Sequence, residues 1–187
     1  MNSLRNSKDT YGSVAKFLHW TIAFLIIMML IMGNIFNEFP KEIRPDVYMF
    51  HKSTGILILA LVAFRIFWRV TNLQPELPAG YDKKIVVGAK FAHLALYALM
   101  IAIPLSGWLF ASPKYPFSFY GLFDIPHLTG PDDKNIRNLA NDAHEFFANG
   151  LIALIMLHLA AAIYHHRILK DNVLTRMLPS CRGKCKK

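Results

Sequence analysis

Three stretches of the chain run for more than 20 residues without a charged side chain. They are residues 17–37, 91–113 and 146–166, and most of their positions are apolar. A helix needs roughly 20 apolar residues to cross a bilayer core of about 30 Å. Each of the three stretches therefore predicts a transmembrane helix.

A fourth apolar segment, residues 47–70, carries charges near both of its ends. Lys52 lies near one end, Arg65 and Arg69 lie near the other, and only residues 53–64 between them are free of charge. By hydropathy alone this segment is a weak candidate for a span. Long basic side chains near a helix end can nevertheless extend to the lipid headgroups, so a fourth helix is compatible with the pattern.

The distribution of Lys and Arg supports four spans, because cytoplasmic flanks of membrane proteins retain basic residues. With four crossings, one side of the membrane holds both termini, the second connection and 15 of the 21 basic residues. The expected fold is therefore all-α, an integral membrane four-helix bundle with both termini cytoplasmic. We expect one domain over residues 1–170 and a basic cytoplasmic tail over 171–187. The expected helices are about 14–36, 47–70, 88–112 and 143–167.

Composition agrees with a membrane protein and excludes other classes. Hydrophobic residues make up 54% of the 187 positions, and the formal net charge is +9. A chain this apolar would collapse, which excludes intrinsic disorder and fibrous structure. Cys181 and Cys185 are too few and too terminal to form a disulfide scaffold, and the sequence leaves their role open. The aromatic third connection, residues 113–141, is expected either to roof the outer end of the bundle or to anchor it at the interface.

Five of the eight histidines lie within the expected spans, where ionisable side chains are costly and usually functional. They fall at two depths. His51 and His144 lie near the outer ends of their helices. The inner level holds His19, His93 and His158.

The interval between His144 and His158 is informative. Fourteen residues of helix rise about 21 Å and bring the two side chains within about 40° of one direction. One helix can thus hold two stacked cofactors. Fourteen residues after His19, His51 and His93 come Gly33, Arg65 and Gly107, respectively. Glycines leave room for a flat ring, and an arginine can pair with a propionate group of a cofactor.

Paired imidazoles in an apolar helical bundle favour b-type heme over zinc or iron–sulfur sites, because the spans offer no carboxylate or thiolate ligands. With histidine on both sides, such an iron carries electrons and does not bind oxygen. Because His51 and His144 are the only intramembrane histidines at the outer level, they are expected to form the outer pair. Spacing alone does not choose two ligands among His19, His93 and His158.

Several runs, taken together in order, resemble the bacterial cytochrome b561 family of small diheme membrane proteins. The resemblance covers about residues 11–179, and a wider one extends to the cytochrome b subunits of membrane-bound hydrogenases and formate dehydrogenases. The runs are His19-Trp20, His51-Lys52-Ser53-Thr54-Gly55, Ala92-His93-Leu94, His165-His166, Lys170-Asp171-Asn172 and Arg176-Met177.

The resemblance implies a ligand set for two heme b groups. In that group of proteins the first and fourth helices share the inner heme, and the second and fourth share the outer one. Carried over, this implies His19 with His158 and His51 with His144. His93 is then a neighbour of the inner heme or of a quinone, with a role as an alternative ligand kept open.

The resemblance also implies an activity in the bacterial inner membrane. Free-standing members resemble a superoxide oxidase, which passes electrons from periplasmic superoxide to ubiquinone or another quinone; no nucleic acid partner is implied. His165 follows His158 by seven residues and so lies on nearly the same helix face, about 10 Å closer to the cytoplasm. We expect it either to contact a quinone carbonyl or to be an ordinary interfacial histidine.

Charge on the outer side bears on the donor. An anion such as superoxide is drawn to positive surfaces, yet the outer segments sum to about −2 from the residues printed in the sequence. Steering would then depend on local charge. The candidates are Lys52, Lys114 and Arg137.

Two other functions remain open at this stage. One is a cytochrome b anchor and electron-relay subunit of a larger membrane dehydrogenase or hydrogenase. The other is a heme-free transporter or ion channel with histidines along its path. Purification with or without a partner subunit distinguishes the first from a free-standing enzyme. The colour of the purified protein tests the second, because a cytochrome is red and a heme-free transporter is colourless.

Overall fold

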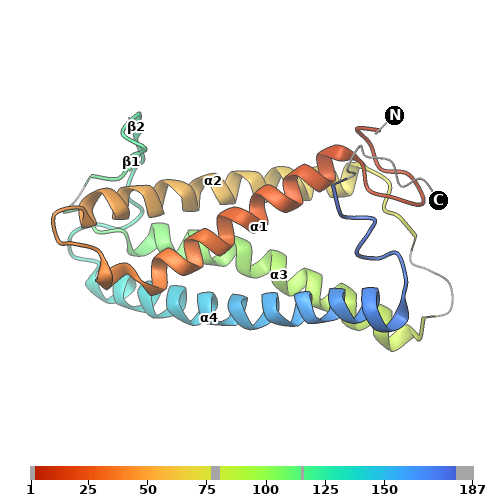
Figure 1. Cartoon of the computed structure of the whole chain (residues 1–187). Helices are drawn as coiled ribbons and strands as arrows, with labels where there is room; N and C mark the ends of the chain where they lie inside the picture. Colours follow the sequence, from red (N-terminus) through yellow and green to blue (C-terminus); the bar gives the residue numbers. More distant parts are fainter. Residues whose placement is uncertain (1–2, 77–80, 115, 180–187) are drawn as a thin grey trace.

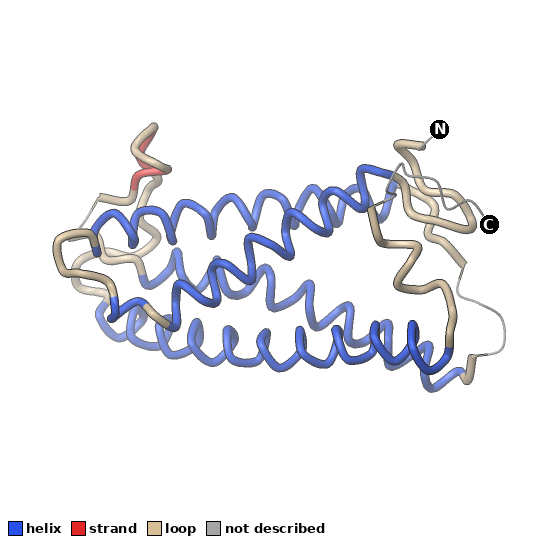
Figure 2. The backbone as a smooth tube through the Cα atoms, viewed as in Figure 1, coloured by secondary structure: helices blue, strands red, loops and turns tan. Residues whose placement is uncertain are grey.

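The structure is a computed structural model that describes residues 3–76, 81–114 and 116–179. Over these ranges the regular structure is helical apart from one short hairpin, and loops join the elements (Figure 2). In chain order the elements are α1 (Ser13–Asn34), the 3₁₀ turn η1 (Phe36–Glu38), α2 (Arg44–Thr71), α3 (Lys83–Phe110), β1 (Ser118–Phe119), β2 (Phe123–Asp124), α4 (Lys134–Tyr164) and the π turn η2 (His165–Leu169).

The four long helices form a membrane bundle, as predicted. Each of them is long and apolar enough to cross a bilayer. Figure 1 shows them running along a common direction, with both ends of the chain at one end of the bundle and the hairpin at the other. We call these the inner end and the outer end, following the orientation expected from charge.

All four helices begin earlier than hydropathy indicated, α3 and α4 by the largest margins. α4 starts at Lys134 instead of near residue 143, and α3 starts at Lys83 instead of near 88. Hydropathy marks the apolar part of a helix but not the polar turns that precede it. The start of α3 is set by a cap, because the Asp82 side chain accepts a hydrogen bond of 2.9 Å from the backbone N–H of Lys84.

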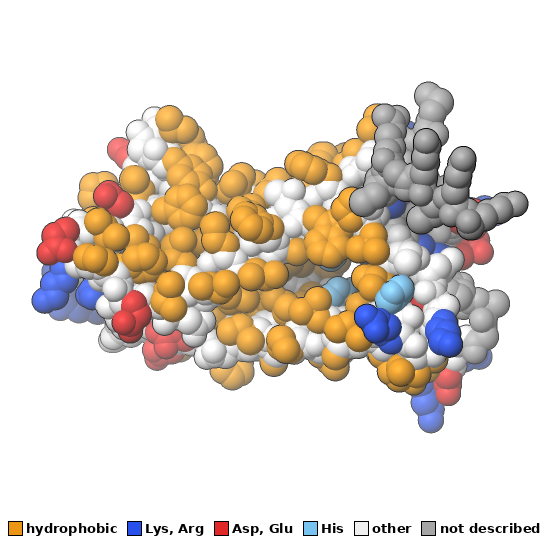
Figure 3. Space-filling model, viewed as in Figure 1, with side chains coloured by type: hydrophobic (Ala, Val, Ile, Leu, Met, Phe, Trp, Pro, Cys, Tyr) orange, Lys and Arg blue, Asp and Glu red, His pale blue; other side chains and the backbone are white. Residues whose placement is uncertain are grey.

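Apolar side chains cover the outside of the bundle. Phe24, Phe64 and Leu157, from three different helices, are all exposed. Figure 3 shows hydrophobic side chains over the middle of the visible face and most of its charged side chains near the two ends. A helix that is apolar on all sides suits a lipid environment, because lipid covers the faces that other helices do not.

A small core fills the middle of the bundle. It consists of Ile22 and Ile26 from α1, Ile58 and Val62 from α2, and Leu151 from α4. Leu151 lies seven residues from both His144 and His158, so this core separates the two histidine levels.

A hydroxyl latch fastens the β1–β2 hairpin to α2. Ser53, which is fully buried, accepts a 2.9 Å hydrogen bond from the backbone N–H of Tyr120 and donates one of 3.1 Å to the carbonyl of Ser118. The Thr54 hydroxyl lies 2.8 Å from the Tyr120 hydroxyl. Beneath the hairpin, Phe117 packs in a second small core. The third connection therefore closes part of the outer end.

Three segments form a cap at the inner end: residues 3–12, 72–76 and 171–179. The Trp20 indole donates a 2.9 Å hydrogen bond to the carbonyl of Met177. The backbone N–H of Glu76 donates to the carbonyl of Lys8 at 3.0 Å. The first part of the expected tail thus packs on the bundle and does not extend into solvent.

Candidate functional site

The outer histidines face each other across a large cavity. His51 from α2 and His144 from α4 have ring centroids 6.3 Å apart, with 61° between the ring planes. The cavity has a volume of about 520 Å³ and is lined by residues from all four long helices, including Gly33 and Gly107. Its size falls in the range of sites that bind an organic cofactor.

The separation of the rings fits one metal ion held between two imidazoles. A metal–imidazole bond of about 2 Å on each side places the ring centroids about 6 Å apart. Among the residues that the structure describes, no three His, Cys, Asp or Glu side chains gather closely enough to hold a bare ion. A pair of histidines beside a large apolar cavity instead suits an iron porphyrin.

Gly107 gives the His144 ring its space. A Cβ at position 107 would lie 3.1 Å from His144 Cε1 and 3.2 Å from Nδ1, closer than ordinary van der Waals contact. At Gly33 a Cβ would lie 3.8 Å from His51 Cε1, so alanine fits there but larger side chains would approach the ring. The two glycines singled out by the fourteen-residue interval therefore both lie beside a ring of the outer pair.

The orientation of His144 is fixed by a carbonyl group. Its Nδ1 lies 2.8 Å from the carbonyl oxygen of Ile103. A carbonyl only accepts hydrogen bonds, so Nδ1 carries the proton and donates, and Nε2 keeps its lone pair for a metal. The His51 Nδ1 is buried without a hydrogen-bond partner among the described residues. Contact with a bound group would explain how that ring is held.

The inner level brings three histidines together. The His158 ring centroid lies 6.3 Å from that of His19 and 5.8 Å from that of His93. The first distance equals that of the outer pair, and the planes of His19 and His158 meet at 64°. His93 is exposed, whereas His19 and His158 are partly buried. Both His19 and His93 lie at a distance from His158 that fits one metal ion between two imidazoles.

Two arginines lie beside the inner level, around Tyr97. The Arg65 Nε donates a 3.0 Å hydrogen bond to the Tyr97 hydroxyl. The guanidinium carbons of Arg65 and Arg69 lie 5.9 and 6.0 Å from the centroid of the Tyr97 ring. A pocket of about 30 Å³ is lined by all three residues and by no carboxylate. Two cations without an acidic partner in the pocket suit a carboxylate or phosphate ligand.

His165 lies in a cluster at the inner end. Its Nδ1 is 2.6 Å from Asp171 Oδ2, and the Tyr81 hydroxyl donates to the same oxygen. Burial would raise the pKa of Asp171, but hydrogen bonds from Tyr81, His165 and the Val173 backbone hold it below its usual value. Burial and the neighbouring carboxylate raise the pKa of Tyr81 to about 12. Sequence reasoning selected His165 and missed both of its partners.

The three expected steering residues do not gather at one place. Lys52 lines the outer cavity, and its Nζ lies 3.3 Å from the carbonyl of Pro116. Arg137, in the first turn of α4, donates to the carbonyls of Gly130 and Pro131 in the loop that precedes this helix. Lys114 is exposed and is not part of the cavity lining.

The cavity lining contains a pair of bonded polar residues that were not singled out from the sequence. Asn141 and Glu145 both line it, and they share a 3.1 Å hydrogen bond. Their spacing of four residues on a helix that carries His144 was the available signal. Cys181 and Cys185 lie outside the described residues.

Comparison with known proteins agrees with this arrangement. The chain is 31% identical over 183 residues to "Cytochrome b561 homolog 2" of Escherichia coli, covering 94% of this chain and 95% of that protein. It is 32% identical over 175 residues to "Probable superoxide oxidase CybB" of Yersinia pestis, covering 92% and 98%. It is also 25% identical over 167 residues to "Cytochrome b562" of Cereibacter sphaeroides, covering 86% and 90%.

The sequence pattern of one family matches nearly the whole chain. That family is described as prokaryotic cytochrome b561, and the match runs over residues 10–180, which include all five histidines of the two levels. The chain therefore belongs to the prokaryotic cytochrome b561 family and is a multi-pass membrane b-type cytochrome.

Proposed function

We propose that the protein is a diheme cytochrome of the bacterial inner membrane that oxidises superoxide at its outer end and reduces quinone at its inner end. The observation that carries the proposal is the repetition of one ring separation, 6.3 Å, at two depths of the bundle. Both pairs use a histidine of α4. A single helix thus supplies one ligand to each of two cofactors.

Each pair has a defined role in this proposal. His51 and His144 hold the outer heme, and His19 and His158 hold the inner one. Arg65 pairs with a propionate of the inner heme, and His93 is its neighbour. A heme iron with imidazole on both sides supplies reversible one-electron transfer. The apolar core around Leu151 excludes water between the two levels.

The reaction balances with two donors for each quinone. Two superoxide anions each give up one electron and leave as dioxygen. One quinone takes both electrons together with two protons and becomes a hydroquinone. The likeness to the Yersinia pestis protein supports superoxide as the donor.

Lys52 is the residue through which the outer cavity would attract an anion. It is partly buried, lies over the Phe117 ring at 5.1 Å and lines the cavity. Glu145, on the same lining, has the opposite charge. Attraction at this site therefore depends on the balance between these two side chains.

The test uses the purified full-length protein in mild detergent. Heme is counted per chain, and heme reduction by a superoxide source is followed with and without a short-chain ubiquinone. The proposal expects two hemes per chain, rapid reduction by superoxide, and reoxidation when quinone is added. One heme per chain, or no response to superoxide, would contradict it.

A second candidate function is electron relay for a larger membrane oxidoreductase. The observation that favours it is the tip of the β1–β2 hairpin, where the apolar side chains of Leu122 and Phe123 are 77% and 58% exposed. Figure 1 shows this hairpin standing off the outer end of α2, where a partner subunit can reach it. Purification under mild conditions distinguishes the two: a co-purifying subunit that is required for activity favours the relay.

A further inference from the structure

A local reversal of the chain at the end of α4 creates a carboxylate–imidazole contact. α4 ends in the π turn η2, and Lys170 follows with a left-handed backbone, φ 53° and ψ 33°. This turn folds Asp171 back so that its backbone N–H donates to the carbonyl of His165. Single π turns and left-handed non-glycine residues recur at functional sites.

Asp171 and His165 make the single close contact between a carboxylate and a basic side chain among residues 3–76, 81–114 and 116–179. The pair is partly shielded, with 20% of the His165 side chain and 12% of the Asp171 side chain exposed. The Tyr81 hydroxyl, from the residue just before the α3 cap, binds the same carboxylate oxygen. The cluster therefore joins three parts of the chain at one point.

The hydrogen bonds leave one atom of the cluster available. The Asp171 carboxylate only accepts, so His165 Nδ1 donates to it and Nε2 faces no protein partner among the described residues. The second carboxylate oxygen, Oδ1, accepts from the backbone N–H of Val173 at 2.9 Å. A proton that this cluster gives to another molecule must therefore leave from His165 Nε2.

We propose that Asp171 and Tyr81 position His165 to donate a proton to the carbonyl oxygen of a quinone bound at the inner end of the bundle, which rests on the function proposed above. Reduction of the quinone takes two electrons from the reduced protein and two protons. His165 Nε2 supplies one of these protons to one carbonyl oxygen. The imidazole then regains a proton from the aqueous side, to which it is partly open, and the second proton of the hydroquinone comes from the same aqueous side.

The neighbouring groups assign the exchangeable proton to the imidazole. The lowered pKa keeps Asp171 ionised at neutral pH, and the raised pKa of about 12 keeps Tyr81 protonated. Arg176 also faces Tyr81, and the Tyr164 ring lies 6.4 Å from that of His165. Histidine is the side chain that exchanges protons in the neutral range.

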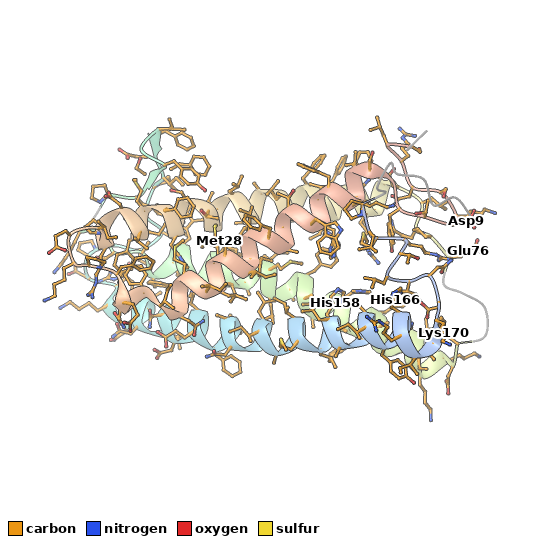
Figure 4. The ribbon with its side chains drawn as sticks, in the orientation of Figure 1. Asp9, Met28, Glu76, His158, His166 and Lys170 are labelled. Carbon is orange, nitrogen blue, oxygen red and sulfur yellow. The ribbon has the colours of Figure 1, made fainter. Side chains whose placement is uncertain are left out.

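The position suits a molecule that also receives electrons from the inner level. His165 follows His158 by seven residues, which places it on nearly the same face of α4, about 10 Å farther along the axis. Figure 4 shows His158 on α4 and His166 nearer the end of this helix, beside the chain reversal at Lys170. Leu159 and Ile163, which lie between His158 and His165 in the sequence, are exposed apolar residues past which a lipid-soluble ring can approach.

The test measures reoxidation of the fully reduced protein by a short-chain ubiquinone in a stopped-flow instrument, between about pH 5 and 8. In Asp171→Asn the imidazole loses the carboxylate that fixes its orientation, so the rate should fall by about tenfold. The wild-type rate should also be lower in D₂O than in H₂O, because a proton moves in this step. A defect that only slows electron transfer to the quinone would show no such solvent isotope effect.

Tyr81→Phe removes one hydrogen bond to Asp171 Oδ2 and keeps the contact of this oxygen with His165, so its rate should fall by less than that of Asp171→Asn. His165→Gln removes the proton donor, so it should lower the rate at least as much as Asp171→Asn and abolish the solvent isotope effect. The matched control is His166→Gln, because His166 is exposed and lies outside the cluster.

Heme content and reduction by dithionite are measured for every variant, which separates loss of folding from loss of proton transfer. Wild-type rates in Asp171→Asn and His165→Gln overturn the proposal, as does a wild-type rate that is the same in H₂O and D₂O. A wild-type protein that quinone does not reoxidise overturns the proposed function and this inference together. If Asp171→Asn fails to bind heme, Tyr81→Phe and His165→Gln still decide the question.

Discussion

Gly107 on α3 and His144 on α4 are in direct contact, and a methyl group at position 107 would lie 3.1 Å from the imidazole Cε1. The position of the ring that faces the outer cavity therefore depends on the absence of a side chain on the neighbouring helix. The Ile103 carbonyl, one turn earlier on α3, accepts a hydrogen bond from the same ring. α3 thus positions His144 although it supplies no histidine to the outer pair.

We predict that Gly107→Ala weakens the outer site. Overpacking of this kind typically costs about 1–3 kcal/mol, and the ring must shift to relieve the contact. Outer-heme content should fall, or the midpoint potential of that heme should change, while the inner heme is retained. Optical redox titration and a heme assay measure both. The control is Gly88→Ala on the same helix, where a Cβ meets no atom within 4 Å; equal behaviour of the two variants would contradict the prediction.

The inner ligand pair is tested by three single substitutions. His19→Ala and His158→Ala should each reduce the heme count from two per chain to one, because an iron that loses one of its two imidazoles binds weakly. His93→Ala should retain both hemes, with at most a shifted spectrum of the inner one. Loss of the inner heme in His93→Ala, with retention in His19→Ala, would transfer the ligand role from α1 to α3.

How far the sequence alone predicts this molecule depends on the kind of feature. The four spans follow from residue type, because a bilayer requires long apolar helices, and the structure contains all four. The pairing of His51 with His144 could be predicted from their depth, because no other intramembrane histidine lies near the outer end. At the inner level His19, His93 and His158 share one depth, so the choice depends on helix packing.

Contacts between distant segments were beyond sequence reasoning. Tyr81 and Asp171 are 90 residues apart and meet because Lys170 adopts a left-handed conformation, which no residue pattern indicates. Charge counts likewise placed Arg137 on the outer side, but its partners are the carbonyls of Gly130 and Pro131. The roles of Ser53 and Thr54 as a latch also required the position of the hairpin.

Arg65 and Arg69 should raise the midpoint potential of the inner heme. A cation near the iron opposes the additional positive charge of the oxidised state, so its removal favours oxidation. Arg65→Gln and Arg69→Gln should each lower the potential by tens of millivolts, where about 59 mV corresponds to a tenfold change for one electron. Arg167→Gln is the control, because Arg167 is exposed in the π turn η2. Unchanged potentials together with a loss of bound anionic lipid would assign the two arginines to lipid phosphate instead.

Lys52 and Glu145 should have opposite effects on the reaction with superoxide. Both line the outer cavity, so replacing the cation weakens the attraction of an anion and replacing the carboxylate strengthens it. Lys52→Gln should slow heme reduction severalfold at low ionic strength, and Glu145→Gln should accelerate it. Both effects should shrink at about 0.5 M salt, because screening shortens the range of electrostatic attraction to a few ångströms.

Lys114→Gln serves as the control, since Lys114 is exposed outside the cavity. If all three variants react like wild-type at every salt concentration, the donor at this cavity is not steered by charge, and a neutral donor or a partner subunit becomes the better explanation.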